Sequence, residues 1–487
     1  MEALDSQQGD IRASIAFQTA LSTPLPPASA EEHQILHCEP YNDSAVSSLP
    51  VEMLGEIFQL AVDGDLGSAE CDVLDVKHSP NWVISHVCRA WRSVALSMPN
   101  LWTFICIEDD SDLLMLDGVP FTDNRATLLR EYLARSSQHP LRITLSSSYD
   151  IQKHLEILLP HFDRCTDVSF TIDQEALITL STISGEFPTL ERLSIVIDDF
   201  SHYPDLPKDP FSTTPQIDGF CKAPNLRAVS LSRISIFHLE LPFSQLQSFT
   251  GDISNFLEHL KLFFLASQLT TATLNVRLIH PPFTLPVPFS HTNLHTLSLY
   301  TDLQCIRDLR LPALEVFRIE KISSGYHHIA KLFQDSQCPL RSLYLEVPAI
   351  RWSKLLPILK ACSSTLTSLS IRVDANSAWE VNNAFTSDGP SCLVPRLEEL
   401  YIRDDIRPRW QDEDIEVSFA DDTFLDMVFW RRGSEDDGEV GEVAVLKSLT
   451  MCAPYAPRPD DTLKELQELE EGGLKVEFRG YPWTKVI

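Results

Sequence analysis

The chain has 487 residues, of which 44% are hydrophobic and 22% are charged, and its formal net charge is −30. This composition is ordinary for a soluble globular protein, and the length suits about three domains or one extended array. The negative charge argues against nucleic acid as the main ligand, because binding to phosphates requires basic surface, and no apolar run approaches the roughly 18 residues of a membrane-spanning helix.

The N-terminus and the cysteines bear on the cellular compartment. The first residues, MEALD, place no basic region ahead of an apolar one, so we expect neither a secretory signal nor a transit peptide. The 11 cysteines are odd in number and widely scattered, without a C-x-x-C pair, which is typical of reduced thiols. We therefore expect an intracellular protein, cytoplasmic and/or nuclear.

Residues 1–45 precede the first periodic pattern. The stretch LSTPLPPASAEEHQ is rich in Pro, Ala and Ser and holds no sustained period. Such a composition buries too little apolar surface to order a chain, so we expect a flexible N-terminal tail.

The stretch SSLPVEMLGEIFQLAV predicts the first helix. Pro50 suits the first helical position, and Glu52 suits the first turn, where the helix dipole favours an acid. Leu49 stands where a polar cap is usual, so we expect its side chain to pack on another surface. Apolar residues then recur at helical spacing and predict one apolar face: Met53, Leu54, Ile57, Phe58 and Ala61.

A second helix is expected from about Asn81 until Pro99 ends it. Arg89 and Arg92 fall off its apolar stripe, and Leu101-Trp102 follows the helix. Because Cys88 falls on the stripe, we expect it to be buried and inert. The stripe has the spacing of one amphipathic helix face: Ile84, Val87, Cys88, Trp91, Val94 and Ala95.

Beyond the second helix, short pieces recur with apolar residues at positions 1, 4 and 6. Many successive copies are 20 to 26 residues apart, which is the period of a leucine-rich repeat. Clear copies start at Leu190, Leu226, Leu294, Leu314, Leu340, Leu366, Leu397 and Leu446, and weaker ones start at Cys165, Leu246 and Leu269.

Each copy predicts one strand of a parallel sheet. The last two apolar residues of a copy are two apart and share one strand face, which only stacked copies can bury. Ser194, Ser298 and Tyr344 then point outward, where such scaffolds usually bind. The segments LEHLKLFFLAS and HIAKLFQDS suit return helices. The predicted fold is α/β: a small N-terminal helical module followed by an irregular leucine-rich-repeat-like solenoid.

The repeat-bearing part, residues 109–487, contains an acidic insertion near residues 404–442. Fourteen Asp or Glu stand there against four Arg, which predicts a solvated loop or, alternatively, a docking surface for a basic partner. In four copies an Asp takes the place of the usual repeat asparagine, so the standard side-chain ladder is not expected: Asp198, Asp302, Asp374 and Asp405.

Residues 46–108 contain a pattern that resembles the F-box, in the variety found in multi-gene families of mushroom-forming fungi. Such F-boxes typically combine LP-x-E-x-L-x-x-I-F, a long connection, V-C-R-x-W-R-x-x-A and P-x-L-W; here Leu49 to Trp102 supplies these fragments in that order. The residues that match motif positions, expected at the adaptor or in the small F-box core, are Leu49, Pro50, Glu52, Ile57, Phe58, Val87, Cys88 and Trp91.

The resemblance implies a substrate-recognition adaptor of a Skp–cullin–F-box ubiquitin ligase. The F-box would bind the Skp-type adaptor and through it the cullin–RING ligase core, while the repeats would hold an unknown protein substrate. The alternative is a stand-alone repeat scaffold whose N-terminal helices are only a cap.

Catalytic motifs are missing from the sequence. It contains no H-E-x-x-H, no G-K-[ST] phosphate loop, no G-x-S-x-G and no paired-cysteine metal spacing. We therefore expect no enzymatic activity, no cofactor and no metal, and neither nucleic acid nor a membrane as a partner.

Overall fold

The computed structural model describes most of the chain from residue 49 onward. The described residues are 49–65, 72–108, 123–147, 151–181, 187–197, 216–276, 288–300, 303–321, 325–373, 378–386, 392–404, 422–432, 443–452 and 460–479. The predicted tail, the four repeat aspartates and most of the acidic stretch lie outside them. The chain divides into two compact units, Met1–Leu54 and Gly55–Ile487.

The N-terminal helices are α2 (Val51–Asp65), α3 (Pro80–Val87), α4 (Arg89–Leu96) and the short 3-10 helix η1 (Pro99–Trp102). The prediction of one continuous second helix is wrong, because Cys88 is extended (φ −158°, ψ 172°) and separates α3 from α4. Two side chains stabilise this break. The Cys88 sulfur accepts the Trp91 N–H and caps α4, and Arg92 Nε donates to the Ser85 carbonyl at 2.8 Å near the end of α3.

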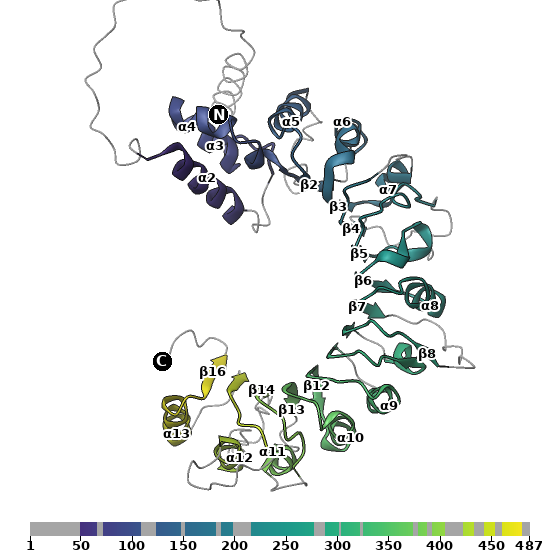
Figure 1. Cartoon of the computed structure of the whole chain (residues 1–487), viewed down its shortest axis with the longest axis vertical. Coiled ribbons are helices and arrows are strands. Elements are labelled where there is room, and N and C mark those ends of the chain that lie inside the picture. The colour runs from purple at the N-terminus through teal and green to yellow at the C-terminus, as the bar shows by residue number, and fades with distance from the viewer. Residues whose placement is uncertain are drawn as a thin grey trace, which may run out of the picture. The chain divides into compact units, whose positions relative to one another are not determined.

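Fourteen strands of the described residues form one parallel sheet in which neighbours follow the order of the chain (Figure 1). Each return segment therefore moves the chain by one strand position. The strands are β1 (Phe104–Glu108), β2 (Leu141–Ser147), β3 (Cys165–Ile172), β4 (Arg192–Ile197), β5 (Ala228–Ser232), β6 (Ser248–Ile253), β7 (Thr271–Val276), β9 (Thr296–Tyr300), β11 (Val316–Glu320), β12 (Ser342–Ile350), β13 (Ser368–Val373), β14 (Glu399–Asp404), β15 (Ser448–Cys452) and β16 (Lys475–Arg479).

The return segments place helices on one face of this sheet, and within the described residues the opposite face carries none (Figure 1). The two return helices expected from the sequence are confirmed as α8 (Phe256–Leu265) and α9 (His327–Ser336). The others are α5 (Asp123–Arg135), α6 (Ile151–Leu158), α7 (Gln174–Ser181), α10 (Trp352–Cys362), α11 (Ala378–Thr386), α12 (Asp422–Arg432) and α13 (Asp460–Glu471).

Shorter elements complete the return segments. The 3-10 helices are η2 (Leu159–Arg164), η3 (Ile236–His238), η4 (Phe243–Gln245) and η5 (Gln304–Ile306). The two-residue strands β8 (Phe289–Ser290) and β10 (Leu309–Arg310) pair with each other in a separate small sheet.

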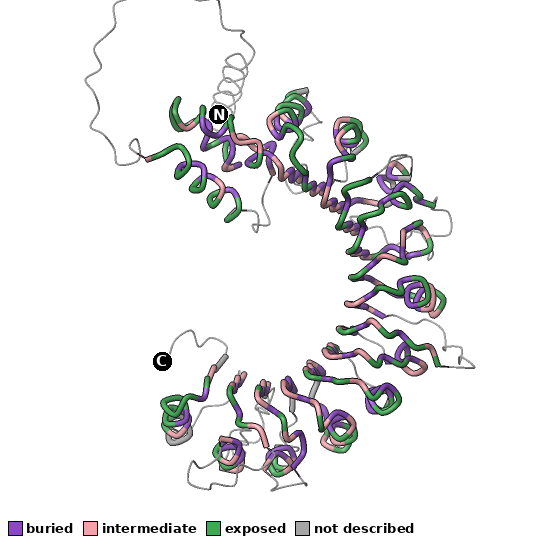
Figure 2. Tube along the Cα trace, viewed as in Figure 1, coloured by how far each residue is buried: buried purple, intermediate pink, exposed green. Residues whose placement is uncertain are grey.

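The core lies between the sheet and the helices, and buried residues recur along the strands and on the helices (Figure 2). On the strands they form two rows that run from strand to strand. All three apolar positions of each clear copy of the repeat are buried. The rows are in register: Leu193 is beside Val229 and Ile195 beside Leu231, and the same pairing continues to β15. The predicted α/β fold with a parallel sheet built from repeated segments is therefore confirmed.

The repeat pattern did not predict the strands β1, β2 and β16. In β2 the buried residues are Leu141, Ile143 and Leu145, at positions 1, 3 and 5 of the segment. The other copies have their apolar residues at positions 1, 4 and 6, so this segment has one residue fewer between its first and second apolar residues. Since β1 begins at Phe104 and pairs with β2, the sheet starts before the residue-108 boundary predicted for the N-terminal segment. Helix α12 was also missed, because its sequence lies in the stretch expected to be an acidic loop.

Candidate functional site

The N-terminal helices enclose a small apolar core. Phe58 is buried, and its ring lies 4.9 Å from the ring of half-buried Trp91. The buried residues of α2 are spaced four apart, at Leu54, Phe58 and Val62, whereas Ile57 is exposed. The apolar face predicted for α2 is therefore only partly buried.

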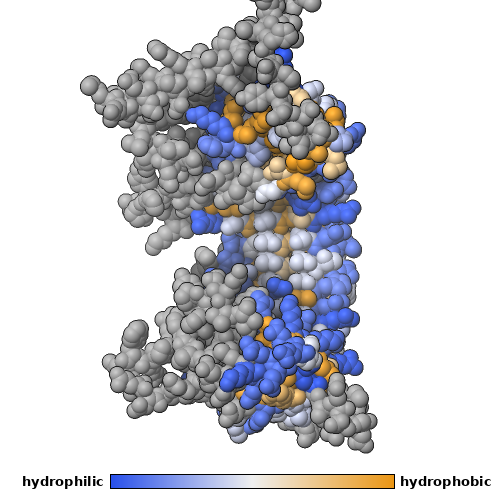
Figure 3. Space-filling model, turned by 90° about the vertical axis from the view of Figure 1, so that its left-hand side faces the viewer, coloured by the Kyte–Doolittle hydropathy of each residue, from blue (hydrophilic) through white to orange (hydrophobic). Residues whose placement is uncertain are grey.

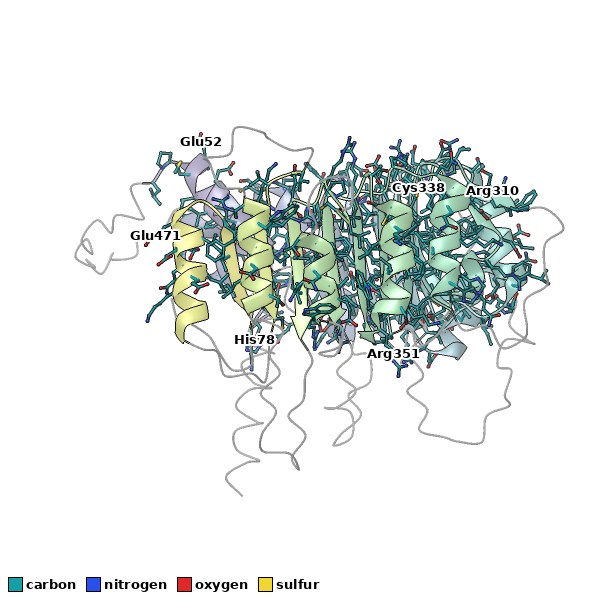
Figure 4. All side chains as sticks on the ribbon, turned by 90° about the horizontal axis from the view of Figure 1, so that it is seen from below. Glu52, His78, Arg310, Cys338, Arg351 and Glu471 are labelled. Atoms are coloured by element: carbon teal, nitrogen blue, oxygen red, sulfur yellow. The ribbon has the colours of Figure 1, made fainter. Side chains whose placement is uncertain are left out.

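The other residues that match the F-box pattern lie at or near the surface. Leu49 is half-buried, and Pro50 and Glu52 are exposed; Figure 4 shows Glu52 projecting from α2. Val87 and Cys88 are exposed as well. The prediction that Cys88 is buried is wrong, because the break between α3 and α4 turns it out of the stripe.

Several large apolar side chains of these helices have no cover within the described residues. On α2, Ile57 is 43% exposed and Leu60 is 70% exposed. On α3 and α4 the exposed apolar residues are Val83, Val87 and Leu96. Exposed apolar side chains that gather on one short helical segment are typical of a protein-binding surface.

Trp102 joins the helical segment to the array. It is fully buried, its indole N–H donates to the Ala95 carbonyl at 3.0 Å, and its ring lies 5.1 Å from that of Tyr132 on α5. Asn81 donates to both the Leu101 carbonyl and the Tyr132 hydroxyl. These contacts link α3 and η1 to the first return helix.

The helix-free face of the sheet carries a row of hydroxyl side chains. Seven successive strands, β2 to β9, place a Ser or Thr at the same register position, and the space-filling view shows pale, weakly polar surface over the middle strands (Figure 3). This hydroxyl row consists of Thr144, Ser169, Ser194, Ser230, Thr250, Thr273 and Ser298. Because a hydroxyl both donates and accepts hydrogen bonds, the row suits a polar, extended ligand.

A hollow of about 390 Å³ lies over the first part of this row. Arg142, Asp167 and Arg192 stand beside the hydroxyls in the lining. Arg192 donates to Asp167, and the Arg142 guanidinium lies 5.3 Å from the centre of the Phe104 ring. The lining of the hollow is mostly apolar and carries side chains of both charges at its side.

From β11 onward the same register row changes character. It continues with Arg318, Tyr344, Ser370 and Tyr401, and the Arg318 guanidinium lies 4.2 Å from the centre of the Tyr344 ring. Tyr and Arg are the residue types most enriched at protein-binding hot spots. The outward position predicted for Tyr344 is thus part of a larger group that the sequence did not reveal.

Two residues further along the strands, on the same face, Arg372 and Arg403 are paired in register on β13 and β14. Burial and the neighbouring Arg403 lower the pKa of Arg372, while Glu346 acts in the opposite direction. Ser370 Oγ donates to Glu346 Oε1 at 3.0 Å and holds that carboxylate beside the arginines. We call Arg318, Tyr344, Arg372, Tyr401 and Arg403 the Arg–Tyr cluster.

The described residues hold no group of three His, Cys, Asp or Glu side chains that could bind a metal ion. Burial raises the pKa of Cys165 and of Cys362 to about 12, so these thiols stay protonated near neutral pH.

The sequence matches no protein-family model, and a search of curated proteins finds no significantly similar sequence. The F-box resemblance therefore stays a prediction. None of the described helices combines the length and apolar character needed to cross a membrane.

Proposed function

We propose that the chain is a non-enzymatic substrate-recognition adaptor of a Skp–cullin–F-box ubiquitin ligase. In this proposal residues 46–108 are an F-box that binds a Skp-type adaptor. The rest of the array is an irregular leucine-rich-repeat-like solenoid that holds a target protein. The ubiquitin transfer itself is carried out by other subunits.

The observation that carries the proposal is the exposure of apolar side chains on helices that are tied to a binding scaffold. Leu60 and Val87 remain exposed, whereas Phe58 and Trp91 of the same segment pack against each other. Covering such side chains with a partner removes apolar surface from water, at about 25 cal/mol per Å². The order of the sequence fragments from Leu49 to Trp102 suggests which partner that is.

The contacts around Trp102 suit this role. A receptor raises the local concentration of its target near the ligase only if the two binding regions keep a productive spacing. The hydrogen bonds of Asn81 and the edge-to-face ring contacts of Trp102 attach α3 and η1 to α5.

A second candidate function is a stand-alone scaffold with a helical cap. Val73 N–H donates to the Cys106 carbonyl at 2.8 Å, and Asp72 accepts from Arg125 at 2.9 Å. The segment before α3 thus covers an edge of β1, which would otherwise expose unpaired backbone groups. Capping and adaptor binding are compatible, so only a partner assay separates the two functions.

The proposal is tested by affinity purification of the full chain from a fungal cell extract, followed by detection of the Skp-type adaptor and the cullin. We expect both to be recovered with the folded chain. A folded chain that recovers neither would leave the cap as the function of the N-terminal helices.

A further inference from the structure

We infer that the Arg–Tyr cluster on the helix-free face binds an acidic peptide segment through the carboxylates of its Asp or Glu side chains. The inference rests on the proposed function in one respect: the array is taken as the part that holds the target. It goes further by naming the chemistry of that target.

The sheet places two arginines side by side on adjacent strands. Arg372 and Arg403 occupy the same register position on β13 and β14, and neighbouring strands are about 4.8 Å apart. Their strands cannot shift, because Ile371 and Ile402 pack in the buried row beside them. Like charges side by side on adjacent strands repel each other. Glu346 offsets part of this repulsion at Arg372, and a carboxylate bound beside both arginines would offset more of it.

The register row two residues before the arginines has a tyrosine on either side of a serine. Tyr344, Ser370 and Tyr401 follow one another across β12, β13 and β14, and Ser370 is 3% exposed whereas both tyrosines are partly exposed. An extended peptide that crosses this row would pack against both aromatic rings. Its side chains would then lie within reach of the arginines two residues further along the strands.

Carboxylates are the ligand that this set of groups favours. A guanidinium group only donates hydrogen bonds and matches a carboxylate with two parallel bonds, and the tyrosine hydroxyls can donate as well. The cluster contains three arginines, and two acids stand beside it: Glu320 and Glu346 are paired in register on β11 and β12, and Ser370 donates to Glu346. A basic peptide would meet those arginines with like charge.

The test measures binding of a fluorescein-labelled peptide of six aspartates to the full chain by fluorescence anisotropy. Peptides of six lysines and of six serines serve as ligand controls. We expect the aspartate peptide to bind, and to bind more weakly as salt is raised, because salt screens exposed charges. The double variant Arg372→Gln/Arg403→Gln should weaken binding at least about ten-fold, since each lost guanidinium removes a charge-assisted pair.

The matched control is Arg142→Gln/Arg192→Gln, which removes the same charge from the same face over β2 and β4 and should bind the aspartate peptide as the wild type does. Circular dichroism verifies folding. If the glutamine variant does not fold, Arg372→Lys/Arg403→Lys replaces it; that variant keeps the charge, loses the planar fork and should bind measurably more weakly.

Four outcomes would overturn the inference: no binding of the aspartate peptide by the wild type, equal binding by the glutamine variant, an equal loss in the Arg142/Arg192 control, or preference for the lysine peptide. The chain's own acidic segment is a further candidate occupant. If Glu435→Gln/Asp436→Asn/Asp437→Asn tightened binding of the aspartate peptide, the cluster would belong to the chain itself and not to an external partner.

Adaptor recovery separates this inference from the proposed function. The Arg372/Arg403 variant should recover the Skp-type adaptor as the wild type does. Failure of peptide binding with normal adaptor recovery would overturn only the inference, and normal peptide binding without any adaptor would overturn only the ligase role.

Discussion

The indole rings of Trp82 and Trp102 meet edge to face, with their centres 5.3 Å apart and their planes at 75°. The guanidinium of Arg135 on α5 lies over both rings, at 4.4 and 4.6 Å from their centres. Burial among these rings lowers the pKa of Arg135. The three side chains come from α3, η1 and α5, so this contact couples the proposed partner-binding helices to the array.

Replacement of Trp102 by Ala should destabilise the protein strongly. The substitution removes a fully buried ring and the hydrogen bond to the Ala95 carbonyl, and Trp→Ala changes in cores typically cost about 3–5 kcal/mol. Denaturant unfolding followed by tryptophan fluorescence measures the loss. Trp379 is the matched control, because it is 62% exposed and its replacement by Ala should cost about 0.5 kcal/mol or less. Similar losses in both variants would contradict the packing described for Trp102.

Arg431 should contribute strongly to the stability of the part of the array around α11 and α12. It is 2% exposed and donates to the carbonyls of Phe385, Leu393 and Val394 at 3.0 to 3.1 Å. Arg431→Met leaves these buried carbonyls without that donor, at an expected cost of about 3 kcal/mol or more. Lys447→Met removes only an exposed ion pair with Glu398 and should cost less than about 1 kcal/mol. Urea unfolding compares the two, and an equal cost would refute the role of Arg431.

His259 should make the protein sensitive to mild acid. Burial between the rings of Phe256 and Phe263 lowers its pKa from 6.5 to about 4. Between pH 6.5 and 4 the unfolded chain therefore binds a proton that the folded protein excludes, so the free energy of unfolding falls as pH falls through this window, by about 3 kcal/mol in total. Above pH 6.5 the effect is absent.

The variant His259→Phe isolates this effect. Its free energy of unfolding, measured at pH 7.0 and 4.5, should fall less than that of the wild type by about 2–3 kcal/mol, because the proton uptake by the unfolded histidine is gone. The same pH dependence in both proteins would show that His259 is not buried in a neutral form.

Cysteine reactivity should follow burial. Cys88 and Cys221 are exposed, whereas Cys165 and Cys362 are buried and have pKa values raised to about 12. Brief alkylation with iodoacetamide at pH 8, followed by peptide mass spectrometry, should label the exposed pair first and the buried pair only after denaturation. Protection of Cys88 in the native protein would instead support the continuous helix expected from the sequence.

The repeat pattern predicted the sheet because burial has a strict period there. Every copy must place its apolar residues in the two buried rows, as Leu193 and Ile195 do, so the pattern is visible in the sequence. The break at Cys88 was not visible in the sequence. Arg92 hydrogen-bonds near the end of α3 and Cys88 caps the start of α4, but the spacing of apolar residues in the sequence continues through both helices without interruption.

The binding surfaces were predicted less completely than the fold. Tyr344 was predicted to face outward, but Arg372 and Arg403 were not singled out, although each directly follows the last apolar residue of its copy and the strand register therefore makes them neighbours. The exposure of Val87 likewise follows from the break at Cys88. Beyond the hydroxyl row, the outward positions share no residue type from strand to strand, since burial does not constrain their residue types.

The central claim is that the exposed apolar residues of α2 bind a Skp-type adaptor. Its most direct test compares binding of the purified adaptor to the wild type and to Ile57→Asp/Leu60→Asp by isothermal titration calorimetry. The matched control is Leu257→Asp/Phe264→Asp, which changes two exposed apolar residues on α8, at 61% and 69% exposure. We predict binding by the wild type and the control, and a loss of at least about ten-fold in the α2 variant, because charges at the core of an interface are costly. Absence of adaptor binding by the folded wild type, or equal binding by all three proteins, would contradict the account.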